Sequence, residues 1–163
     1  MQTGGNRFME KEQMIREFSA FLPFVRSLSG IGDELWNAPL GEGKWSVGDV
    51  VAHMMLWDRY FLEEAIARIA RSEPVTVRHL DFDEFNKNAV QYAKGKSRLD
   101  IIDAAVNERD EIIRILSALS EEEFMMEHTD GDGRPFSAYG YVQGFIPHDV
   151  HHMDQLQAFI SKH

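Results

Sequence analysis

Hydrophobic residues recur at intervals of three and four along most of the chain, and the alternation typical of strands is nearly absent. The first helical pattern runs from about Met9 to Leu28. Pro23 lies inside this pattern and is expected to kink or divide the helix, because proline clashes with the preceding turn. Glycines and a proline between residues 29 and 44 predict a loop with one short helical turn around Trp36.

The second pattern has a defined start. Ser46 is followed three residues later by Asp49, which predicts a capping box in which each side chain binds the other's backbone amide. A helix from Val47 to about Ala70 should follow, with Asp58 away from its apolar stripe. The predicted stripe consists of Val50, His53, Met54, Trp57, Phe61 and Ala65.

Two further helices follow a connection at residues 71–80. Residues 81–94 predict a short helix that ends near Gly95, and Ser97 caps a third long helix that continues to about Ser120. The apolar positions of this third helix are Leu99, Ile102, Ala105, Val106, Ile112, Ile113, Leu116 and Leu119. Residues 120–124 predict one more helical turn, and the glycine-rich run at 128–136 predicts a small hairpin.

The last helix is predicted from Ser137 to Ser161. Its inward stripe contains Tyr141, Phe145, His148, His152, Leu156 and Phe159. Gly144 and Pro147 precede the two histidines, so the helix is expected to kink or restart there. Four long amphipathic helices without strands predict an all-α four-helix bundle, and the absence of linkers or repeats predicts a single domain over residues 1–163.

Composition narrows the classes of function. The chain has no cysteine, which excludes protein thiolate ligands and nucleophiles. Neither a signal peptide nor an apolar run of about 20 residues is present, so we expect a cytoplasmic protein that does not enter membranes. Asp and Glu number 27 against 17 Lys and Arg, and the formal charge of −10 makes nucleic acid an unfavourable partner.

Three histidines are the best candidates for chemistry. His148 and His152 are spaced i, i+4, so their imidazoles project from one face of the last helix, and His53 faces inward from the second. Burying three imidazoles without partners would cost about 1–3 kcal/mol for each unsatisfied group, whereas a shared metal would satisfy all three. Neutral imidazoles suit Zn, Ni, Co, Fe or Cu and leave a position for water or substrate.

The segment from Trp45 to His53 resembles the WSxxEVxxH motif of the DinB/YfiT-like metal-binding four-helix bundles. The segment HDVHHMDQ, which ends at Gln155, resembles their HxxHHxxQ motif. The resemblance implies an up-down-down-up bundle, often a homodimer, with His53, His148 and His152 as facial ligands of a divalent metal and His151 outside the set. Asp49 replaces the usual Glu, and Pro147 directly before His148 departs from the pattern.

The resemblance also implies a function. Relatives include metal-dependent thiol S-transferases and thiol-dependent isomerases, so we expect an enzyme that activates a small thiol or water for a small-molecule substrate, as a transferase or hydrolase. A non-catalytic metal-binding or stress-responsive bundle is the alternative. Residues that could assist are Trp57, Tyr60, Asn86, Tyr92, Asp149 and Asp154. His79, His128, His151 and His163 are expected at the surface, and Trp45 is expected to pack on the bundle end.

Overall fold

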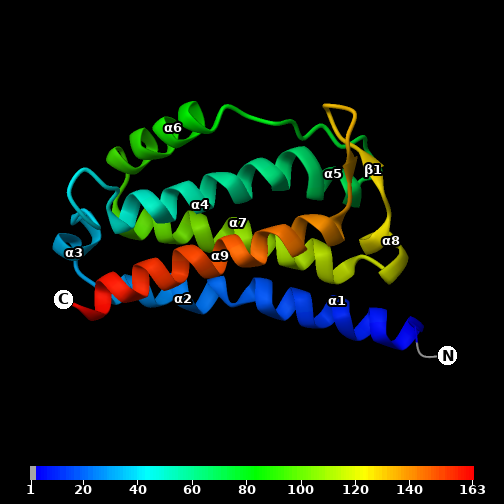
Figure 1. The fold of residues 1–163 in the computed structure, drawn as a ribbon, viewed down its shortest axis with the longest axis horizontal. Helices are drawn as coiled ribbons and strands as arrows, with labels where there is room; N and C mark the ends of the chain where they lie inside the picture. Colours follow the sequence, from blue (N-terminus) through cyan, green and yellow to red (C-terminus); the bar gives the residue numbers. More distant parts are fainter. Residues whose placement is uncertain (1–2) are drawn as a thin grey trace.

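The structure is a computed structural model that describes residues 3–163, with side chains from Glu10 onward. Met1 and Gln2 of the predicted domain lie outside the described residues. Four helical segments lie side by side along the long axis and confirm the four-helix bundle (Figure 1). These segments are α1 (Thr3–Ser19) with α2 (Phe21–Ser27), α4 (Val47–Phe61) with α5 (Ala67–Ala70), α7 (Arg98–Ala118), and α9 (Ala138–Ser161).

The direction of the helices confirms the up-down-down-up order. The chain runs one way along α1 and α2 and returns along α4, and residues 71–81 then lead back over the outside of α4 to α6 (Phe82–Lys94) (Figure 1). Because of this return, α7 runs in the same direction as α4, and α9 runs in the same direction as α1. The remaining short elements are a 3₁₀ turn (Leu28–Gly30), α3 (Asp33–Asn37), α8 (Glu121–Met125), β1 (His128–Thr129) and β2 (Pro135–Phe136).

Serine caps fix the starts of the long helices. Ser46 Oγ accepts from the Asp49 amide at 3.1 Å, and the Asp49 carboxylate accepts from the Ser46 amide at 3.0 Å, which confirms the predicted capping box. Ser97 and Ser137 cap α7 and α9 through their side-chain oxygens. These contacts satisfy backbone donors that the first helical turn leaves unpaired.

Two helices differ from the prediction in their interior. The second helix contains a π-helical turn (Leu62–Ile66) between α4 and α5, which the periodicity does not reveal. The last helix is continuous through Pro147, so of the two predicted outcomes the restart is wrong, and the kink stays a prediction. The division of the first helix is confirmed: it breaks at Ala20, and Pro23 occupies the first turn of α2, where a missing N–H is tolerated.

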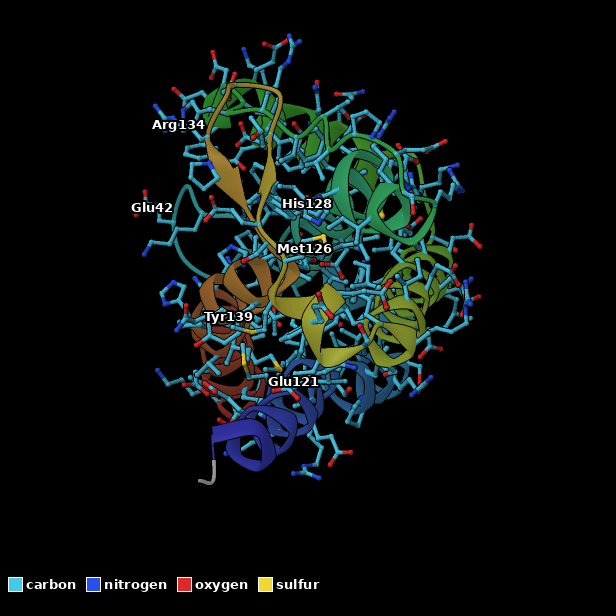
Figure 2. The ribbon with its side chains drawn as sticks, turned by 90° about the vertical axis from the view of Figure 1, so that its right-hand side faces the viewer. Glu42, Glu121, Met126, His128, Arg134 and Tyr139 are labelled. Carbon is cyan, nitrogen blue, oxygen red and sulfur yellow. The ribbon has the colours of Figure 1, made fainter. Side chains whose placement is uncertain are left out.

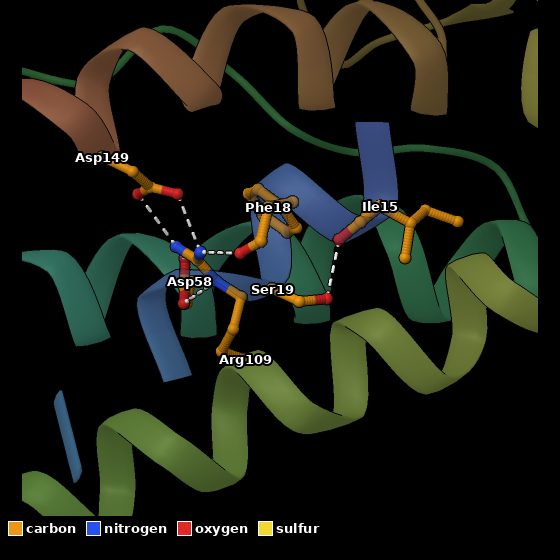
Figure 3. Close-up of polar contacts among 6 residues, drawn as sticks. All are labelled: Ile15, Phe18, Ser19, Asp58, Arg109 and Asp149. Carbon is orange, nitrogen blue, oxygen red and sulfur yellow. Dashed lines mark hydrogen bonds and ion pairs between the residues drawn. The ribbon is translucent and has the colours of Figure 1, made fainter. Parts of the chain in front are cut away.

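The centre of the bundle contains a buried charged cluster (Figure 3). Arg109 of α7 binds the Asp58 carboxylate with donor–acceptor distances of 2.8 and 3.1 Å and the Asp149 carboxylate with distances of 2.8 and 3.0 Å. It also donates to the Phe18 carbonyl at 2.9 Å. Asp58 is 1% exposed, so its predicted place off the buried stripe is wrong. Burial alone would lower the pKa of Arg109, but the two carboxylates outweigh burial and raise it.

Apolar side chains surround this cluster on both sides and form the core. One group includes Phe18, Ile112 and Leu116, and the other includes Phe21, Val51 and Met55. Leu99, predicted on the buried stripe of α7, is 53% exposed because it lies in the first turn at the bundle end. Within residues 3–163, none of the helices combines the length and apolar character needed to cross a bilayer.

Candidate metal centre

The three predicted histidines converge from two core helices. His53 lies in the middle of α4, and His148 and His152 lie one turn apart on α9. One nitrogen from each imidazole can be chosen so that all three lie within 4.8 Å of one another. The ring centroid of His53 is 5.7 Å from that of His148 and 5.3 Å from that of His152. A single small cation could therefore be shared by side chains that are about 100 positions apart in the chain.

The electrostatic environment keeps these imidazoles neutral. Burial, followed by the neighbouring His152 and His148, lowers the pKa of His53 to about 4. Burial and the neighbouring His148 lower the pKa of His152 to about 4, and burial also lowers the pKa of His148. A neutral imidazole has a free lone pair, which is the form that binds a metal.

Unsatisfied nitrogens show that the cluster fits a cation. His53 Nδ1 and His148 Nδ1 are buried without a hydrogen-bond partner among the described residues. His152 Nδ1 lies 3.4 Å from Gln155 Oε1, and because an amide oxygen only accepts, this contact leaves the lone pair on Nε2. Gln155 is the last residue of the HDVHHMDQ motif, so the motif supplies both ligands and an orienting group.

Among the side chains that the structure describes, the cluster contains three ligand candidates and no fourth. Over the residues with described side chains, no Cys, Asp, Glu or further His joins His53, His148 and His152. His151 is exposed, as predicted, although its ring centroid lies 5.2 Å from that of His152. Three protein ligands leave room for an exogenous molecule on a metal.

A cavity of about 580 Å³ reaches the histidine cluster. His53 and His148 line it, together with residues from α4, the 71–81 connection, α6, the β1–β2 loop and α9. A second cavity of about 530 Å³ meets the first at Phe61, Phe136, Phe145 and His148 and extends toward the start of α9. These volumes are typical of sites for small molecules.

Aromatic side chains enclose the histidines. The centroid of the Trp45 ring lies 5.1 Å from that of His53, so Trp45 contacts the site instead of serving only as a cover for the bundle end. Phe85 of α6 lies 6.3 Å from His53 and stacks on Trp57 at 3.9 Å. The sequence pattern does not predict this role for Phe85, because its approach to His53 depends on how α6 folds back over α4.

The other predicted assisting residues divide into two groups. Trp57 and Asn86 line the cavity, and Asn86 has a buried side-chain oxygen without a hydrogen-bond partner among the described residues. Asp149 binds Arg109 and thus does not orient an imidazole, while Tyr60 binds the backbone of Arg78.

The remaining predicted residues fall outside the histidine cluster. Tyr92 lies beside Arg59, and Asp154 lines a separate groove near α2. His79 is exposed but lines the cavity, and His128 has a buried Nε2 in strand β1, so the prediction of a free surface side chain is wrong for His128. His163 is exposed.

The chain is similar to a known protein family and to a solved structure. A family model of the DinB superfamily matches residues 14–156. The solved structure of YfiT from Bacillus subtilis, described as a probable metal-dependent hydrolase with an unusual four-helix bundle topology, superposes with a TM-score of 0.72. The two chains are 14% identical, and the match covers 93% of this chain and 86% of YfiT. No curated protein sequence matches the chain significantly.

Proposed function

The chain belongs to the DinB superfamily, and on this premise we propose that it is a metal-dependent enzyme that activates a small thiol, or water, for attack on a small-molecule substrate. We assign His53, His148 and His152 as ligands of a divalent metal such as Zn, Ni or another first-row ion. The cavity at His53 and His148 is the observation that carries the proposal. A catalytic site requires such access, whereas a structural site is closed by a fourth protein ligand.

The chemistry divides between the metal and the protein. A divalent cation held by the three neutral imidazoles would keep its charge and would lower the pKa of a thiol or water bound to it. Gln155 holds His152 in one tautomer, and the rings of Trp45, Trp57 and Phe85 reduce the access of water to the site. These side chains orient and shield the reactants.

The lining of the cavity supports a thiol as the first choice of nucleophile. Its two carboxylates, Asp130 and Asp132, lie in the exposed loop between β1 and β2 and bind backbone amides. Apart from these two loop residues, the cavity lining lacks an acidic side chain that could act as a general base, among the described residues. Thiol transfer would suit this arrangement, because a bound divalent cation would lower the pKa of a thiol enough for its proton to pass to solvent without a protein base.

Hydrolysis is the second candidate. The fold similarity to YfiT, described as a probable metal-dependent hydrolase, favours water as the nucleophile. We expect a small-molecule substrate in either case, and we propose that the chain acts as a cytoplasmic homodimer. Sedimentation at micromolar concentration would test the dimer, and a monomeric mass would contradict it.

Metal analysis tests the ligand assignment. Protein purified without a chelator or a nickel column should contain about one divalent ion per chain. The variants His53→Ala and His152→Ala should lose it, because two imidazoles bind far more weakly than three. His151→Ala is the matched control, since it removes a neighbouring imidazole outside the cluster and should keep the metal.

Turnover tests the enzymatic role. The metal-loaded protein should consume low-molecular-weight thiols in the presence of small electrophiles, or hydrolyse small amides or esters, and both His variants should lose this activity. A bound metal without turnover in either panel would indicate the non-catalytic alternative. Unchanged metal content in His53→Ala and His152→Ala would contradict the site itself.

A further inference from the structure

The walls of the cavity are apolar and aromatic. Trp57, Phe61, Phe82, Phe136 and Phe145 all line it. Most of these rings pack on one another, with centroid distances of 5.0 Å between Phe61 and Phe145 and 5.8 Å between Trp57 and Phe82. Phe82 remains 53% exposed at the mouth. An exposed aromatic ring beside an open cavity offers a favourable surface to an apolar body of a ligand.

Two cations stand at the mouth of this aromatic cavity. Arg78 comes from the connection after α5, and Arg134 comes from the β1–β2 loop, at the outer edge of the hairpin in Figure 2. Neither guanidinium forms an ion pair with the described carboxylates. On a chain with a formal charge of −10, two arginines without acidic partners at one opening are an exception to the prevailing charge.

The carboxylates at the mouth limit how much negative charge a ligand can carry. Asp130 accepts from the amides of Asp132 and Arg134 at 2.8 and 2.9 Å, and Asp132 accepts from the His79 amide at 2.6 Å. Asp130 therefore binds the loop backbone and Asp132 binds the backbone of the 71–81 connection, and neither carboxylate forms an ion pair with Arg78 or Arg134 among the described residues. The two negative charges would nonetheless repel a dianion more than a monoanion.

A polar group deeper in the cavity adds a second point of recognition. Asn86 Oδ1 is buried and lacks a hydrogen-bond partner among the described residues. The Asn86 side chain lies close enough to His53 to counteract part of the decrease in the pKa of His53. A ligand with a hydroxyl or N–H group near its reactive end would satisfy this oxygen.

We propose that the cavity binds small monocarboxylates with a planar apolar body, whose carboxylate lies between Arg78 and Arg134 and whose other end faces the histidine cluster. The planar fork of arginine matches a carboxylate, and the volume of about 580 Å³ holds a body of one or two rings. This assignment of a substrate class rests on the proposed function for the reaction at the histidines.

The experiment uses metal-free protein and a matched pair of probes, 2-naphthoate and 2-naphthamide. Both have the same ring system, and only the first is charged. Titration followed by tryptophan fluorescence should give saturable one-to-one binding of both, with naphthoate bound about five-fold more tightly at low salt. In Arg78→Gln and Arg134→Gln the ratio of the two affinities should decrease toward one. Arg71→Gln is the control, because Arg71 is an exposed arginine outside the cavity.

One further variant and one further probe test the apolar contact and the charge of the ligand separately. Phe82→Ala should weaken both probes to a similar degree, because it removes apolar contact and not charge. Binding of 2-naphthyl phosphate more tightly than naphthoate would overturn the assignment of a monoanion. Equal affinity for the two first probes, a preference that persists in both arginine variants, or no binding of either probe would overturn the proposal.

Failure of the proposed function gives a different pattern. His53→Ala should abolish metal binding and keep the naphthoate preference, because both arginines, which distinguish the charged probe from the neutral one, are unchanged in this variant. If the wild-type protein binds no metal but prefers naphthoate over naphthamide in an arginine-dependent way, the result supports the ligand class and contradicts the proposed enzymatic role.

Discussion

His53 is the most constrained side chain of the candidate site. It is 7% exposed, and its Nδ1 has no partner among the described residues. Five aromatic or imidazole rings have centroids within 6.4 Å of the His53 centroid, those of Trp45, Trp57, Phe85, His148 and His152. A buried imidazole with an unsatisfied nitrogen reduces the stability of a metal-free protein. The folded chain therefore keeps a binding-competent group at the expense of stability.

This burial predicts how the stability of the metal-free protein depends on pH. His53 and His152 have a pKa of about 4 in the folded state and of 6.5 in the unfolded state. As the pH falls from 6.5 to 4, the unfolded state takes up protons that the folded state does not, so the free energy of unfolding should decrease. For His53 the decrease should reach about 3 kcal/mol below pH 4.

Urea denaturation between pH 7.5 and 4 would measure this effect. His53→Gln should show a smaller decrease than the wild type, because glutamine takes up no proton, while His163→Gln at the exposed C-terminus should match the wild type. Identical pH profiles for the wild type and His53→Gln would contradict the prediction.

Two segments outside the bundle core form the outer wall of the cavity. The β1–β2 loop packs against the 71–81 connection, and the Gly131 amide donates to the Val77 carbonyl at 2.8 Å. A Cβ atom on Gly131 would lie 2.7 Å from the Thr76 carbonyl oxygen and 2.7 Å from Arg78 Cγ. Only glycine permits this approach, because one of the contacting atoms belongs to the backbone.

We therefore expect Gly131→Ala to separate the loop from the connection and to reduce stability by about 1–3 kcal/mol. Amide hydrogen exchange should increase at Gly131, and thermal denaturation should measure the loss of stability. Gly144→Ala in α9 is the control, since no atom lies within 4 Å of the added methyl group. It should be neutral or stabilise the helix by up to about 1 kcal/mol. A Gly131→Ala variant as stable as the wild type would contradict the close contact.

Local patterns predicted most of the elements. Ser46, Ser97 and Ser137 begin the helices where the sequence indicates, because capping depends on residues three apart. The continuity of α9 through Pro147 could not be predicted, because packing of a long helix in the bundle overrides a local preference. The π-helical turn at Leu62–Ile66 has no distinct residue pattern.

Four helices meet at the buried Arg109 cluster. Asp58, Arg109 and Asp149 come from α4, α7 and α9, and Phe18 of α1 contributes a carbonyl and a ring 3.9 Å from the guanidinium carbon (Figure 3). Asp149 directly follows His148, so the same contact fixes the rotation of α9 that turns His148 inward. Periodicity could not predict this cluster, because it treats charged residues as exposed and the partners are 51 and 40 positions apart.

Removal of the Arg109 guanidinium should strongly destabilise the folded protein. Arg109→Leu would leave two buried carboxylates without a partner, and we expect a loss of about 3–5 kcal/mol in the free energy of unfolding, measured by urea denaturation. The triple variant Asp58→Leu, Arg109→Met, Asp149→Leu removes all three charges and should recover most of that loss. Equal destabilisation of the single and triple variants would contradict an electrostatic origin.

The histidine cluster and the outer cavity wall come from different parts of the fold, so substitutions can change one without the other. The three histidines lie on core helices α4 and α9, whereas Arg78, Phe82 and Arg134 lie on the connection, α6 and the hairpin loop. Substitutions in these outer segments can thus change the cavity lining while the core helices and the histidine cluster stay intact. A library randomised at those three positions should yield altered selectivity without loss of expression, and the same separation would allow descendants of one scaffold to diverge in substrate.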